Sequence, residues 1–163
     1  MNTPVLPEAI CPQPKDDGVT HINLYTKGAT PLGRGLSNLN SQYPFTHPQW
    51  GKWRTLEGLW YFLGTGCTHW ELQTMDGFLA KKHGRGLPRV ERPTFDRELK
   101  IGMLCKVMQN PELLELFLSS TLPFTHYYYY GDAQGNPKVI ADLKSSAMIC
   151  NSFEWLRLLL QAH

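Results

Sequence analysis

The chain has 163 residues, of which 42% are hydrophobic and 18% are charged, and its formal net charge is +2 at pH 7. This length and composition are typical of one globular domain and exclude an intrinsically disordered chain. The small positive charge excludes a general nucleic-acid coat, although it leaves room for a local basic groove.

The cysteines and the apolar runs indicate the compartment. The four cysteines, Cys11, Cys67, Cys105 and Cys150, are too far apart for paired metal ligands or for a disulfide framework. No stretch has the apolar core of a signal peptide, and none is long enough to span a bilayer. We therefore expect a cytoplasmic protein with reduced thiols and no membrane contact.

The first third of the chain is rich in residues that break regular structure. Residues 1–18 carry four prolines in a polar setting and predict an irregular arm, so the domain is expected to span residues 19–163. Alternation of apolar and polar residues around Ile22 predicts a short strand at residues 21–25. Glycines and prolines make residues 28–51 a predicted loop.

Helical periodicity begins at Thr55. Leu56, Leu59, Trp60 and Leu63 follow the i, i+3, i+4, i+7 pattern of one helix face, which Gly64 and Gly66 end. The run Thr68–Glu71 has the form of a capping box and predicts a second helix, with Leu72, Met75 and Leu79 facing inward.

The second half of the chain predicts three more helices and a hairpin. One helix begins near Phe95, and its inward face is expected to carry Ile101, Leu104, Cys105 and Met108. Another begins at Asn110-Pro111, where proline suits the first helical position. The hairpin pairs residues 127–130 with 138–143, and the last helix covers residues 146–161. The whole is a helix-dominated α+β domain with a short strand near residue 22 and a small hairpin before the C-terminal helix.

Few residues point to chemistry through spacing alone. The sequence has no H-E-x-x-H, no Cys-x-x-Cys and no P-loop, which disfavours metal hydrolysis and ATP chemistry. Glu57 near a helix start either complements the helix dipole or acts as a general acid-base beside Trp60 and Tyr61. Lys27 is either a solvated loop lysine or an amine nucleophile among aromatics.

Arginine between glycines occurs twice, at Arg34 and Arg85. Both are either solvated turn residues or anion ligands, because glycine lets the backbone approach a phosphate that guanidinium binds in a bidentate way. Nearby lysines, Lys81 and Lys82, add slight weight to a phosphorylated ligand, although they also suit a helix C-terminus. The Tyr127–Tyr130 run fits a strand, or its rings stack on a base.

The order and spacing of several motifs resemble those of the YbiA-like, or NADAR, N-glycosidases. The resemblance covers roughly Ile22 to the C-terminus. It rests on Leu24–Lys27 followed by Gly33–Asn38, on the T-L-E-G-L-W-Y run at Thr55–Tyr61, on Ala80–Arg85, and on the helix pair at Phe95–Ser119. Near the C-terminus the chain departs from the family, because Tyr130-Gly131-Asp132 stands in place of W-G-x-G.

The resemblance implies cleavage of an N-glycosidic bond between ribose C1″ and a base or amine nitrogen. A carboxylate assists such cleavage because the transition state resembles an oxocarbenium ion. By resemblance, Glu57 is the proton carrier and Lys27 is the amine that forms a Schiff base, with no metal and no cofactor. The substrate-binding residues that it implies are Arg34 and Arg85 for the pyrophosphate, Asn38 for a ribose hydroxyl beside Ser37, Trp60 as a wall, and Tyr130.

The resemblance also implies a substrate class. The expected activity is removal of ADP-ribose from modified guanine in DNA, as in defence against ADP-ribosylating toxins or in phages that evade them. The protein is expected to be a monomer. An N-glycosidase on small ribosylamine phosphates of riboflavin synthesis is the alternative enzyme. A non-catalytic module that binds ADP-ribose is the alternative from another class.

Overall fold

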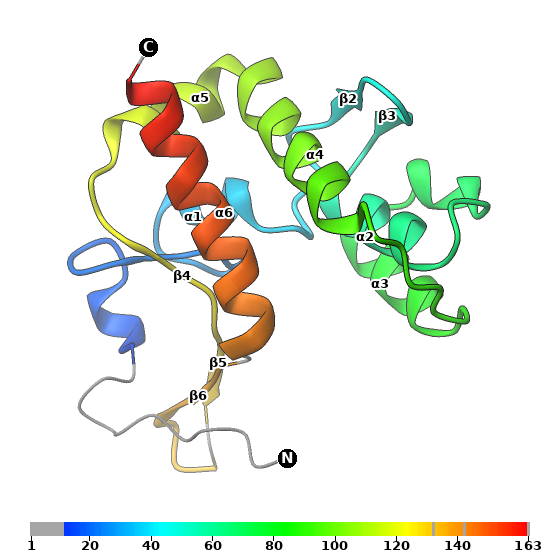
Figure 1. Cartoon of the computed structure of the whole chain (residues 1–163). Helices are drawn as coiled ribbons and strands as arrows, with labels where there is room; N and C mark the ends of the chain where they lie inside the picture. The colour runs from blue at the N-terminus through cyan, green and yellow to red at the C-terminus, as the bar shows by residue number, and fades with distance from the viewer. Residues whose placement is uncertain (1–11, 132, 142, 163) are drawn as a thin grey trace.

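A computed structural model of the chain describes residues 12–131, 133–141 and 143–162 (Figure 1). The described residues form six α-helices and three two-stranded sheets, which confirms the helix-dominated α+β fold. The helices are α1 (Pro31–Leu36), α2 (Leu56–Gly64), α3 (Gly77–Arg85), α4 (Phe95–Gln109), α5 (Pro111–Ser119) and α6 (Leu143–Gln161). None of them is long and apolar enough to cross a membrane.

The three sheets are short. One joins segments that are far apart in sequence, and the other two are local hairpins. Strand β1 (Ile22–Asn23) runs parallel to β4 (Phe124–Thr125) and so links the two ends of the domain. The other pairs are antiparallel hairpins, β2 (Phe45–His47) with β3 (Gly51–Trp53), and β5 (Tyr128–Gly131) with β6 (Pro137–Ile140). The strand near residue 22 and the late hairpin are thereby confirmed.

The N-terminal arm expected over residues 1–18 lies partly outside the described residues. Its last part forms a 3-10 turn at Pro14–Asp16, and the Asp17 that follows is buried. The Asp17 carboxylate accepts hydrogen bonds from the backbone N–H of Asn23 at 3.0 Å and of Ala29 at 2.8 Å. The chain before β1 is therefore tied to the domain by Asp17, which composition alone did not predict.

Helix α2 lies at the centre of the core and confirms the predicted helix. The Thr55 hydroxyl accepts a hydrogen bond from the Gly58 N–H at 3.0 Å and caps its N-terminus. Its apolar face is fully buried against α3 and α4 through Leu56, Leu59, Phe62 and Leu63. Full burial of a leucine or phenylalanine contributes about 1.5–3 kcal/mol, so this face is a main source of stability.

The loop expected over residues 28–51 was wrong in two places, because it contains α1 and the β2–β3 hairpin. Helix α1 forms despite two glycines because Thr30 caps it, with its hydroxyl accepting from Gly33 N–H at 2.9 Å, and Pro31 fits its first position. Leu32 and Leu36 bury its inner face. A Cβ at Gly33 would overlap the Asn23 carbonyl oxygen, so glycine permits α1 to pack on β1.

The capping box expected at Thr68–Glu71 was also wrong. That stretch leads into a 3-10 turn at Trp70–Gln73, and α3 starts after Asp76, whose carboxylate accepts from the Leu79 N–H at 3.0 Å. Leu79 does not face inward, because its side chain is 48% exposed. Asp76 caps α3 instead, so the helix starts later than predicted and a different face points inward.

The inward face expected for α4 was wrong as well. The structure buries Leu99, Met103 and Val107, whereas Met108 is 46% exposed. Two charged residues, Glu98 and Lys106, share the buried face and disguise its apolar period. Glu98 accepts two hydrogen bonds from the guanidinium of Arg92, at 2.7 and 2.9 Å, which explains how its carboxylate is accommodated.

The C-terminal half follows the sequence prediction more closely. Helix α5 begins with Pro111 and buries Leu113 and Phe117. The β5–β6 hairpin pairs Tyr128 with Ile140, and α6 buries Ile149, Phe153 and Leu156. Helix α6 begins at Leu143, slightly earlier than expected. In Figure 1 it lies alongside β4, with α2 and α3 on the other side of the molecule.

Gly84→Ala is expected to destabilise the α2–α3 interface. A Cβ at Gly84 would overlap the ring of Tyr61, which packs directly on α3. Overpacking of this kind costs about 1–3 kcal/mol in the free energy of unfolding, measured by urea denaturation. Gly86→Ala is the matched control, because its nearest new contact is an ordinary 3.5 Å to the His83 carbonyl oxygen. Equal loss in both variants would contradict this account.

Candidate active site

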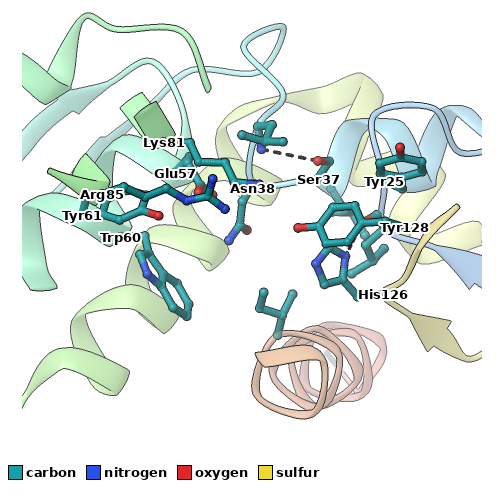
Figure 2. Close-up of a pocket in the computed structure, with 14 residues that line it drawn as sticks. Tyr25, Ser37, Asn38, Glu57, Trp60, Tyr61, Lys81, Arg85, His126 and Tyr128 are labelled. Carbon is teal, nitrogen blue, oxygen red and sulfur yellow. Dashed lines mark hydrogen bonds between the residues drawn. The ribbon is translucent and has the colours of Figure 1, made fainter. Parts of the chain in front are cut away.

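A cavity of about 300 Å³ opens between α2–α3 and the segments that surround β1 and β5. Figure 2 shows side chains of α2 and α3 on one side, Tyr25, His126 and Tyr128 on the other, and Asn38 between them. The lining residues are Leu24, Tyr25, Leu36, Ser37, Asn38, Leu39, Glu57, Trp60, Tyr61, Lys81, Arg85, His126, Tyr128 and Ile149.

The carboxyl of Glu57 has a raised pKa in this cavity. It lies in the first turn of α2, and its N–H donates to the Asn38 carbonyl oxygen at 2.9 Å. Burial raises the pKa of its carboxyl from the ordinary 4.5 to about 7, although Lys81 and Arg85 oppose the shift. A carboxyl that titrates near neutral pH can both donate and accept a proton, as general acid-base catalysis requires.

Two cations on α3 face the same cavity. Lys81 and Arg85 are four residues apart, so they lie on one helix face. The Lys81 ammonium lies 5.3 Å from the centre of the Tyr128 ring, a cation–π contact that joins the two sides of the cavity. Arg85 is more exposed, which places a guanidinium where the cavity meets solvent. The site therefore combines a protonatable carboxyl, an amine and an anion ligand.

The wall opposite α3 is aromatic. Tyr25 meets Tyr128 edge-on with ring centroids 5.4 Å apart, and the ring of His126 meets that of Tyr128 at 5.2 Å. His126 Nδ1–H donates to the Leu24 carbonyl oxygen at 2.7 Å, because a carbonyl can only accept. Flat, rigid rings of this kind suit a sugar or a base as ligand.

Comparisons with known proteins bear on the fold. No family model matches the chain, and no curated protein matches it. A solved structure, the NMR structure of the E. coli protein YbiA, superposes with a TM-score of 0.62, covering 88% of this chain and 90% of that chain at 17% identity. The chain has a YbiA-like fold. The fold implied by the sequence resemblance is thereby confirmed.

Within this YbiA-like fold, five of the eight predicted site residues line one cavity. They come from two places, Ser37 and Asn38 from the turn after α1, and Glu57, Trp60 and Arg85 from α2 and α3. Segments far apart in sequence thus converge, as the hypothesis of a shared site requires. The roles assigned to these residues stay predictions.

The other three predicted residues do not line the cavity. Lys27 is exposed in the turn after β1, and its carbonyl oxygen accepts from the Tyr129 hydroxyl at 3.0 Å. Arg34 lies on the solvent face of α1 and donates to the Gly28 carbonyl oxygen at 2.9 Å. Tyr130 is 49% exposed near the end of β5. The turn and the helix face direct these side chains elsewhere.

Sequence reasoning left several lining residues out of the predicted site, above all Lys81, which it weighed only for a phosphorylated ligand. Lys81 belongs to a basic run that also fits a helix C-terminus, and only the packing of α3 on α2 turns it towards Glu57. Its i, i+4 spacing to Arg85 is the signal that could have found it. Tyr25 and His126 carried no comparable pattern, whereas Tyr61 was considered only as a neighbour of Glu57 and Tyr128 only as part of the Tyr127–Tyr130 run. The described residues contain no His, Cys, Asp and Glu cluster that could hold a metal ion.

Proposed function

We propose that this protein is an N-glycosidase that removes ADP-ribose from modified guanine bases in nucleic acid. The observation that carries the proposal is Glu57, a carboxyl whose pKa burial raises to about 7, beside Lys81 in an aromatic cavity. Glycosidic cleavage needs a carboxyl that can exchange a proton at the reacting centre. The YbiA-like fold is compatible with such an activity.

The proposed reaction uses Lys81 as the amine. Glu57 delivers its proton to the ribose ring oxygen, which opens the sugar and leaves C1″ as an imine to the base. The Glu57 carboxylate left behind takes a proton from the Lys81 ammonium, and the free amine attacks C1″ to form a new C–N bond. Glu57 then gives that proton to the base nitrogen and takes another from the attached Lys81 nitrogen, so that the bond from C1″ to the base breaks as the Lys81 Schiff base forms. Water then hydrolyses the Schiff base, which frees the ribose aldehyde and restores the amine. Lys81 replaces Lys27 in this role because Lys27 lies outside the cavity.

The cavity is large enough for only part of the proposed substrate. About 300 Å³ is at the small end for ligand pockets, enough for the ribose and the attached base. The diphosphate would then lie at the mouth, where Arg85 can bind it in a bidentate way. Asn38 would orient a ribose hydroxyl, and Trp60 would flank the base.

The surroundings of the mouth favour a large anionic substrate. The exposed Arg89 guanidinium lies 5.4 Å from the centre of the Phe95 ring, and Phe95 meets Trp60 edge-on at 5.3 Å. Trp60 lines the cavity, so cations and rings continue outward from it. Phosphates and unstacked bases bind such surfaces. A role in reversing toxin-made ADP-ribosylation would follow from this substrate.

The test is to incubate the protein with an ADP-ribosylated oligonucleotide and, separately, with a ribosylamine phosphate. Chromatography with mass spectrometry should detect free ADP-ribose and the restored base in the first reaction, with rates that fall as salt rises. Cleavage of the ribosylamine alone would replace this proposal with the small-substrate enzyme. ADP-ribose binding without any cleavage would instead support the non-catalytic module.

A further inference from the structure

Lys106 is a buried amine that the proposed reaction does not use. It lies on the inner face of α4, its side chain is fully buried, and burial lowers its pKa to about 7. It forms no salt bridge with any carboxylate of the described residues. A buried amine is costly unless it is hydrogen-bonded, so the partner that it finds among the described residues is informative. Lys106 Nζ donates to the Ser37 carbonyl oxygen at 3.0 Å.

That carbonyl begins the turn that lines the cavity. The Ser37 oxygen also accepts from the Asn40 N–H at 3.0 Å, which closes the turn, and the Asn38 oxygen accepts from the Glu57 N–H at 2.9 Å. A Cβ at Gly77 would overlap the backbone of Leu39, so α3 packs tightly against the same turn. The turn is therefore held by α4 through Lys106, by α2 through Glu57, and by α3 through Gly77.

The three attachments differ in what they fix. The contact at Gly77 is steric, and the bond from Glu57 is made by backbone alone. Among the described residues, only Lys106 holds the turn through a side chain that reaches from another helix, 69 residues away in sequence. Without that donor, the Ser37 oxygen would keep, among the described residues, only the Asn40 N–H as a partner, and α4 would no longer fix the turn.

We propose that Lys106 is a positioning residue, which holds the turn Ser37–Asn40 so that Asn38 faces the cavity at the start of α2. Lys106 does not line the cavity, so it acts on a ligand only through this turn. Its effect on catalysis rests on the proposed function, whereas its effect on the turn does not. An apolar residue of similar length should leave α4 packed but release the turn.

The experiment compares Lys106→Met with Lys100→Met, a control at an exposed position of the same helix. Amide hydrogen exchange should become about tenfold or more faster in residues 37–40 of Lys106→Met and in the Glu57 N–H bonded to them, and stay unchanged in the rest of α2 and in α5. Affinity for ADP-ribose, measured by calorimetry, should fall about tenfold, and kcat should fall more than KM rises. Lys100→Met should match the wild type in all these measurements.

The outcomes separate this proposal from the proposed function. Unchanged exchange in residues 37–40 of Lys106→Met overturns the positioning role, whatever the activity of the wild type. Faster exchange confined to residues 37–40 and the Glu57 N–H bonded to them supports it, even if the wild type cleaves nothing. If Lys106→Met does not fold, Lys106→Leu, which also lacks an N–H donor, takes its place. Uniform loss of protection throughout that variant would overturn the proposal, because the lysine would then serve the core in general.

Discussion

Glu57→Gln is expected to reduce cleavage about 10²–10⁴-fold while leaving affinity for ADP-ribose within a few-fold, because the amide keeps the shape of the carboxyl but cannot exchange a proton. Single-turnover rates on an ADP-ribosylated oligonucleotide would measure the loss. Glu115→Gln, at an exposed position on α5, is the matched control and should retain full activity. Full turnover in Glu57→Gln would remove this carboxyl from the mechanism.

The same variant is expected to be more stable than the wild type above neutral pH. The folded pKa of Glu57 is about 7, above the ordinary 4.5, so the folded state binds more protons than the unfolded state between these values. Wild-type stability from this group therefore falls as pH rises from about 4.5 to 7 and stays lowered beyond. A shift of this size corresponds to a cost on the order of 3 kcal/mol.

The pH dependence of stability tests whether the gain in Glu57→Gln comes from the charge of Glu57. The difference in unfolding free energy between Glu57→Gln and wild type should grow from pH 4.5 to pH 8, as urea denaturation can measure. If this difference in unfolding free energy did not change with pH, burial would not raise the pKa of Glu57, and this account would be wrong. Loss of activity together with gain of stability is the combination expected for a group held in an unfavourable state for function.

The sequence predicted element positions better than it predicted helix faces. Thr55, Pro111 and the apolar run of α6 are local signals, and the helices they mark were found. The face of α4 was wrong because Glu98 and Lys106 are charged and yet buried. Glu98 pairs with Arg92 six residues before it, and Lys106 reaches the Ser37 carbonyl 69 residues away, and helix periodicity reports neither contact. Buried polar residues of this kind gather where a fold supports a site.

In the candidate site, too, the residues in local motifs were predicted, whereas those placed by tertiary packing were not. Glu57 and Asn38 lie in motifs whose order along the chain carries the resemblance, and both reach the cavity. Lys27 lies in such a motif too, but the turn after β1 leaves its side chain exposed. Lys81 reaches the cavity through the crossing of α3 over α2, a relation that no local pattern contains. The packing of α3 on α2 therefore favours Lys81 over Lys27 as the amine of the proposed reaction.

Lys81→Met is expected to reduce cleavage at least 10³-fold, whereas Lys27→Met should keep wild-type rates, because only Lys81 lies within the cavity beside Glu57. Borohydride added during turnover should trap ADP-ribose on Lys81, located by peptide mass spectrometry, since it reduces a Schiff base to a stable amine. Trapping on Lys27, or activity lost in Lys27→Met alone, would return the nucleophile to the turn after β1.

Removing Lys81 should also change the titration of Glu57, which separates a true cavity amine from a remote one. The Lys81 charge lowers the pKa of Glu57 and so opposes the effect of burial. In Lys81→Met the pKa of Glu57 should therefore rise above about 7, as carboxyl carbon NMR would record, while Lys27→Met should leave it unchanged. An unchanged Glu57 titration in Lys81→Met would show that the two groups do not interact, and a shared catalytic role would then fail on electrostatic grounds, whatever the rates.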